Sequence, residues 1–313
     1  ASLPRITTRH PLWEQPDLCE TIAAGQHALP HAAHGRRETL GVDPVSGRVR
    51  EVIHLPGNSW WPLVAGGLLA LLCIALLLKQ YIPALVIALA AVVVLLRWSW
   101  ENGAHPRAAG GEAHDLPQGL KLHSRTFDGP GLWGMGMTML ADTALYGALL
   151  FGWLYLWTVV PDGRPPAVSP LGTWPLALVT VVFGAGLWML RGGVRNLRAG
   201  RDAGLRTRLW ATSALGMLAC AGLVALLAGA GLQPGLRAHD AVLAFTLVFL
   251  LLHGALATVL AALQALRVQL GHVSMAAPYE PGVVAMLWLF CTGATAGAWV
   301  LMAMLPLAFG SPG

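Results

Sequence analysis

Apolar residues gather in seven long runs along the chain, and most polar residues lie between these runs. A helix needs about 20 mostly apolar residues to cross the hydrocarbon core of a bilayer. The pattern therefore predicts seven membrane-spanning helices, at 59–78, 82–98, 135–160, 174–190, 209–232, 241–266 and 282–309. The predicted fold is an all-α polytopic membrane protein, with two helices set apart from five.

Four regions follow from this pattern. We expect a polar cytoplasmic arm over 1–58, a two-helix hairpin over 59–100, a cytoplasmic linker over 101–130 and a five-helix bundle over 131–313. The arm is rich in proline, so it is predicted either to lie extended on another surface or to be a disordered tail. Leu12 and Trp13 are the candidate residues for docking it onto a partner.

Composition and charge support the membrane assignment. The chain is 56% hydrophobic and 11% charged, whereas soluble domains carry roughly 25% charged residues. Its basic character, net charge +5, does not indicate nucleic acid, because the basic residues lie between the spans. Seventeen of the 20 Lys and Arg lie on the side of the N-terminal arm. The positive-inside rule then predicts a bacterial inner-membrane protein with a cytoplasmic N-terminus and a periplasmic C-terminus.

No catalytic or metal centre is predicted from the sequence. The four cysteines form no CxxC motif, and phosphate-binding glycine motifs are absent. Only His253 lies deep in a predicted span, and one histidine cannot make a bis-histidine haem site or a three-histidine copper site. His27, His31 and His34 have a spacing that would align two imidazoles on a helix, but the neighbouring prolines argue against a helix there.

Two polar side chains inside the spans are candidates for proton or lipid chemistry, Asp142 and His253. A carboxylate near the middle of a membrane costs about 2.5–3.5 kcal/mol and often marks a functional position. The alternative for Asp142 is a structural hydrogen bond to Thr138 or Thr143, and the alternative for His253 is neutral helix packing. A small-solute transporter with a midplane site at these two residues is a further alternative, although transporters usually show several charges or broken helices.

Several segments resemble subunit III of the haem-copper cytochrome c oxidases. In the third span, Gly136-Met137 and Leu140-Ala141-Asp142 resemble that family's glycine–methionine helix, with Asp where the family usually has Glu. The segment from Phe249 to Gly254 resembles its histidine-bearing helix. Trp288-Leu289-Phe290 resembles its Trp-His-Phe run, with the histidine missing. The tail and the last loop resemble fused subunit I–III oxidases at Leu3-Pro4, His10–Glu14, Arg37–Leu40, Leu55–Gly57 and Gly271–Ser274.

The resemblance implies a non-catalytic subunit III of an aa3-type oxidase, which reduces oxygen to water and pumps protons. Subunits I and II would be the partners and would hold the haem and copper, this chain holding no cofactor itself. The subunit would stabilise subunit I, bind phospholipid and support proton uptake, and would meet cytochrome c through the complex. An accessory subunit of a quinol oxidase or a nitric oxide reductase is the nearest alternative.

Overall fold

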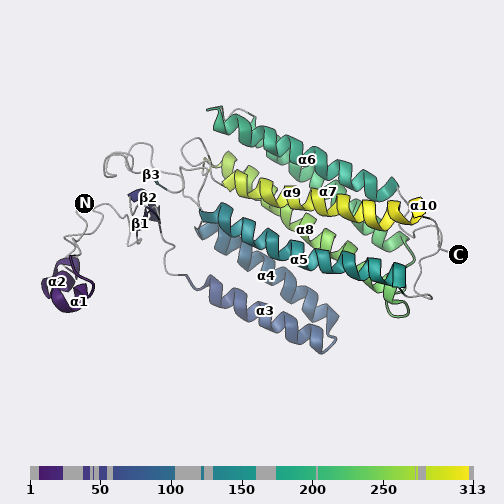
Figure 1. Cartoon of the computed structure of the whole chain (residues 1–313), viewed down its shortest axis with the longest axis horizontal. Helices are drawn as coiled ribbons and strands as arrows, with labels where there is room; N and C mark the ends of the chain where they lie inside the picture. The colour runs from purple at the N-terminus through teal and green to yellow at the C-terminus, as the bar shows by residue number, and fades with distance from the viewer. Residues whose placement is uncertain are drawn as a thin grey trace. The chain divides into compact units, whose positions relative to one another are not determined.

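A computed structural model describes residues 7–23, 38–42, 45, 49–54, 59–102, 121–122, 130–159, 174–201, 204–271, 273 and 280–309. The chain divides into two compact units, Ala1–His123 and Ser124–Gly313. The boundary between them falls inside the predicted linker 101–130. Each unit is described by itself, and Figure 1 gives the order of the elements along the chain.

The first unit begins with short elements in the segment predicted as an arm. These are the helices α1 (Pro11–Glu14) and α2 (Asp17–Ala23) and the strands β1 (Glu38–Val42) and β2 (Val49–His54). The two strands pair antiparallel, with Thr39 opposite Ile53, and a register shift occurs at Gly41/Val42. A third strand, β3 (Lys121–Leu122), pairs parallel with β2. The sequence did not predict this small sheet.

The helices α3 (Trp61–Leu77) and α4 (Tyr81–Asn102) form the predicted hairpin. Lys79 lies in the turn with φ 57°, a left-handed conformation that few non-glycine residues adopt. The amide of Gln80 donates to the carbonyl of Ala75 at 2.8 Å, and the amide of Lys79 donates to Leu76 at 3.0 Å. These bonds satisfy carbonyls at the end of α3 in the manner of a Schellman motif, so the chain can reverse within three residues.

The second unit is a bundle of long helices, which lie side by side in Figure 1. They are α5 (Pro130–Val159), α6 (Trp174–Arg198), α7 (Leu205–Gly229), α8 (Ala238–Gln269) and α9 (Glu280–Ala298), the last followed by a π-helical segment, η4 (Trp299–Met304), and by α10 (Leu305–Phe309). Helices α6, α7, α8 and α9 form a closed ring of neighbours, and α5 packs on α8 and α9.

The described helices confirm the all-α multi-pass membrane fold. Six of them, α4 to α8 and the continuous α9–η4, are long and apolar enough to cross a membrane. The seventh apolar helix, α3, has 17 residues, or about 26 Å, close to the lower limit for a span. The predicted span 174–190 ends early, because α6 continues to Arg198. Arginine is a good helix former, so a run of arginines ends the apolar span without ending the helix.

Glycines allow the ring of helices to pack closely. A Cβ at Gly186 would collide with the indole of Trp288, and one at Gly254 would lie 2.7 Å from the ring of Phe183. A Cβ at Gly216 would likewise collide with the side chain of Thr258. Hydrogen bonds cross between the same helices: the Trp288 indole N–H donates to the carbonyl of Ala257 at 3.1 Å. Small residues and interhelical hydrogen bonds are what hold helices together where lipid surrounds them.

Candidate functional site

Asp142 of α5 and His253 of α8 meet inside the helix bundle. Asp142 Oδ2 lies 3.4 Å from His253 Nε2, and the two side chains are 26% and 19% exposed. Asp142 is twelve positions from the start of α5 at Pro130, about 18 Å along the helix. His253 lies near the middle of the 32-residue helix α8. The two candidates, which the sequence placed on different predicted spans, therefore form one pair deep within the apolar spans.

The hydrogen bond of His253 to the backbone defines which nitrogen of its ring carries a proton. His253 Nδ1 lies 2.8 Å from the carbonyl oxygen of Phe249. A carbonyl only accepts, so Nδ1 carries a proton and donates it. One further proton at the Nε2–Oδ2 contact makes the pair neutral overall, whether the proton belongs to the carboxyl or to the imidazole. A neutral pair is much less costly in a membrane than a lone carboxylate.

Aromatic rings surround the imidazole. The centroid of the His253 ring lies 4.1 Å from that of Phe249 and 5.4 Å from that of Phe290. Tyr146 follows Asp142 by one turn of α5 and stacks on Phe249 at 5.7 Å. Its hydroxyl donates to the carbonyl of Ala294 in α9 at 2.5 Å. These rings restrict the orientation of the imidazole and join α5, α8 and α9 around the pair.

Thr138 and Thr143, the alternative partners predicted for Asp142, form hydrogen bonds to backbone carbonyls of their own helix. Thr138 donates its hydroxyl proton to the carbonyl of Gly134 at 3.0 Å, and Thr143 donates to Met139 at 2.6 Å. Each hydroxyl has one proton to give, so neither donates to Asp142. The described side chain that faces the carboxyl is His253.

Sequence reasoning missed two buried polar clusters of the bundle. His239 and Asp240 are each 6% exposed, and Asp240 accepts a hydrogen bond from the amide of Gln233 at 3.0 Å. The predicted span began at 241, so Asp240 was placed in the preceding loop and was not considered as an acidic residue of α8. At the other end of α8, Arg267 pairs with Glu280 at 2.7 Å. Gln264 donates to the same carboxylate at 2.8 Å.

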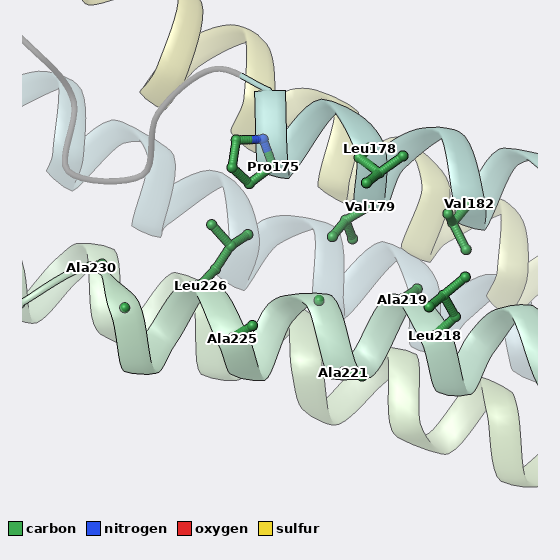
Figure 2. A pocket seen from close by; sticks show the side chains of 12 residues that line it. Pro175, Leu178, Val179, Val182, Leu218, Ala219, Ala221, Ala225, Leu226 and Ala230 are labelled. Carbon is green, nitrogen blue, oxygen red and sulfur yellow. The ribbon is translucent and has the colours of Figure 1, made fainter.

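An open apolar groove of about 600 Å³ lies between α6 and α7 (Figure 2). Branched side chains of α6 form one wall and mostly small residues of α7 form the other. Examples are Leu178, Val179 and Val182 on α6 and Ala219, Ala225 and Leu226 on α7. All lining side chains are apolar. The groove can accept a hydrocarbon chain, but it offers no side chain for acid–base chemistry.

The other candidate residues lie apart from the pair. Leu12 and Trp13 belong to α1 and are 66% and 87% exposed, so they are available for docking. His27, His31 and His34 lie outside the described residues. Within the described ranges, no group of three His, Cys, Asp or Glu side chains is placed to hold a metal ion.

No protein-family model matches the chain, and the comparison with curated proteins gives no match either. The role of the Asp142–His253 pair therefore has to follow from its own geometry and chemistry.

Proposed function

We propose that this chain is subunit III of an aa3-type cytochrome c oxidase of a bacterial inner membrane, with its N-terminus cytoplasmic and its C-terminus periplasmic. In that role it stabilises subunit I, binds phospholipid and supports proton uptake while the enzyme reduces oxygen to water. The haem and copper belong to subunits I and II, and cytochrome c is met through the assembled complex.

The observation that carries the proposal is the Asp142–His253 pair. A carboxyl and an imidazole 3.4 Å apart can hold one proton between them and exchange it with a neighbouring group. Such a pair suits a subunit that assists proton delivery and performs no electron transfer. The resemblance of the segments around both residues to subunit III supports the same assignment, as does the division into two and five apolar helices.

The same pair supports a second candidate, a small-solute transporter with its site at the level of Asp142 and His253. Against this, α5 and α8 run as unbroken α-helices through both residues. Transporter sites are typically built from interrupted helices whose ends face the substrate. An accessory subunit of a quinol oxidase or nitric oxide reductase would use the pair in the same way, and differs in the haem proteins bound to it.

Leu12 and Trp13 are the residues that we propose to dock against the catalytic subunit. Two large apolar side chains exposed on one helical turn are costly in water and become favourable when a partner covers them. In the proposed assembly, α1 lies on the cytoplasmic surface of subunit I.

Purification of the tagged chain from its own membranes, in mild detergent, tests the proposal. We expect it to co-purify with larger subunits and with haem, seen as a Soret band in proportion to the chain, and peptide mass spectrometry then identifies subunits I and II. A colourless chain that purifies alone and moves a solute across vesicles would establish the transporter instead. Co-purification with a haem protein that oxidises quinol or reduces nitric oxide would establish the nearest alternative.

A further inference from the structure

Six arginines lie close together in sequence where α6 leads into α7. They are Arg191, Arg195 and Arg198 on α6, Arg201 after it, and Arg206 and Arg208 on α7. We call this set the arginine patch. Five of its side chains are exposed and Arg208 is partly buried. Because α6 and α7 pack against each other, the patch covers one end of this helix pair.

The stability of the helices does not account for the whole patch. Arg195 and Arg198 lie in the last turn of α6, where a cation interacts favourably with the helix dipole. Arg206 and Arg208 lie in the first turn of α7, where the dipole disfavours a cation. Arg191 and Arg195 are four residues apart on one helix, so their like charges repel. This concentration of positive charge attracts anions.

The described carboxylates of the bundle do not supply that anion. Asp142 faces His253, Asp240 accepts from Gln233, and Glu280 is held by Arg267 and Gln264. Within the described part of the chain, Arg191, Arg195 and Arg208 have no ion pair with any of these groups. Among the described residues of the bundle, these three arginines therefore have no counter-charge and present a cationic surface.

Two glycines give Arg208 a defined position on α6. A Cβ at Gly192 would collide with the Arg208 guanidinium, and a Cβ at Gly193 would lie 3.5 Å from Cδ of the same side chain. The guanidinium therefore lies against the backbone of α6, three residues before Arg195. Residues three apart are neighbours on a helix surface. The cations of α6 and α7 thus form a single surface.

The patch lies where the apolar spans end. Trp188 is 74% exposed and lies one turn before Gly192, and Trp210 is 45% exposed and follows Arg208 by two residues. Exposed tryptophans beside arginines are typical of the interface between hydrocarbon and headgroups. Below this level the outer faces of α6 and α7 carry exposed apolar side chains such as Val181 and Met217. The surface is cationic at headgroup level and apolar beneath it.

We propose that the arginine patch binds the headgroup of an anionic phospholipid, whose acyl chains run along α6 and α7. Arginine suits a phosphate because its planar guanidinium donates two parallel hydrogen bonds to the oxygens. Basic pockets between membrane helices are known to select anionic lipids in this way. The inference rests on the proposed function in that it specifies where the chain binds phospholipid and which class it prefers, whereas the assignment to an oxidase is tested separately by co-purification with haem.

The test uses the full chain, with whatever subunits co-purify, in phosphatidylcholine vesicles that contain spin-labelled phosphatidylglycerol or spin-labelled phosphatidylcholine. The immobilised fraction of each label, measured by electron spin resonance, gives the relative association constant. We expect a preference for phosphatidylglycerol that weakens in high salt. The substitution Arg208→Gln should lower the association of phosphatidylglycerol by about fivefold, the usual effect of one basic residue at an anionic surface. Arg237→Gln, which removes an exposed charge elsewhere, should leave it unchanged.

A second variant keeps every charge. Gly192→Ala adds a methyl group where the Arg208 guanidinium lies and should displace it, so the preference should fall toward that of Arg208→Gln. Gly293→Ala on α9 is the matched control, because nothing lies within 4 Å of the added Cβ and α9 is not one of the two helices along which the acyl chains run. Equal preference in the wild-type chain, Arg208→Gln and Gly192→Ala would overturn the proposal. So would an unchanged lipid preference together with the loss of a co-purifying subunit, which would show that the patch binds an acidic protein surface.

Discussion

The indole ring of Trp288 in α9 packs directly against the backbone of α6 at Gly186. The same indole is completely buried and donates its N–H to the carbonyl of Ala257 in α8. The ring of Phe183 meets it edge-on, with centroids 5.6 Å apart. One side chain thus joins α6, α8 and α9, and it does so only because residue 186 has no Cβ.

Gly186→Ala should therefore destabilise the bundle. The added methyl group would have to displace Trp288 or separate α6 from α9, and overpacking of this kind costs about 1–3 kcal/mol. Thermal unfolding in detergent, followed by circular dichroism, measures the loss. Gly229→Ala is the control, since its Cβ meets open space and alanine favours a helix over glycine. Equal unfolding temperatures for the two variants would mean that α6 and α9 separate without cost.

Asp142 and His253 should be energetically coupled. Replacing either residue by Ala leaves the polar side chain of the other without its partner inside the membrane region. Replacing both removes that unpaired polar group. A double-mutant cycle on the free energy of unfolding should give a coupling of about 0.5–3 kcal/mol. The cycle of Thr143→Val with His253→Ala should be additive, because Thr143 bonds to Met139. Additivity in both cycles would show that the 3.4 Å approach contributes nothing to stability.

The proposed role in proton uptake gives a kinetic prediction for Asp142→Asn. The amide has almost the size of the carboxyl and still forms hydrogen bonds, so haem content in the purified complex should be normal. Initial oxygen turnover should fall only modestly, since no ligand of a redox centre has changed. Sustained turnover should decay faster than in the wild type, because slow proton delivery prolongs the life of reactive intermediates. Identical time courses of oxygen uptake at matched haem content would limit Asp142 to a structural role, and loss of haem would indicate a role in assembly.

The Arg267–Glu280 ion pair should contribute strongly to the junction of α8 and α9. The two side chains are 6% and 21% exposed, and removing one partner of a buried ion pair costs about 3 kcal/mol or more. Glu280→Leu should therefore lower the thermal unfolding temperature. Adding Arg267→Met should restore part of the loss, because the buried cation is removed as well. Arg237→Gln, at an exposed position, should have little effect.

The charge distribution predicts the orientation of the chain. Seventeen of 20 basic residues lie on one side of the seven predicted spans, which places the N-terminus in the cytoplasm. Reporter fusions at Ala199, between α6 and α7, and at Ser311 should report opposite sides, cytoplasmic and periplasmic. The same side for both fusions would mean that one of the three helices between them, α7, α8 or α9, does not cross the membrane.

The apolar runs predicted the helices well, because in lipid a helix is the simplest structure that satisfies every backbone polar group. The ends were less predictable. Arg191 marked the end of an apolar run, yet α6 continues to Arg198. Likewise α5 begins at Pro130 rather than at the predicted 135, so Asp142 lies about three turns from the start of its helix.

Contacts between distant residues were not predictable. Helices α5 and α8 are apolar around most of their surface, so the sequence carries no periodicity that shows which face of each meets the other. For this reason the sequence placed Asp142 and His253 together only in the transporter alternative, and their direct contact could not be predicted. The small sheet was missed because β3 has two residues and pairs with a strand far away in sequence.

The π-helical segment Trp299–Met304 lies just before Pro306, whose ring would clash with the carbonyl of Met302 in a regular helix. A wide turn of this kind contains one residue more than an α-helix would need. The helix after this segment is thereby rotated relative to the helix before it, so one helical wheel cannot describe the whole of the last span. The last span therefore consists of two helical segments whose side chains follow different angular positions around the axis, and the π-helical turn connects them.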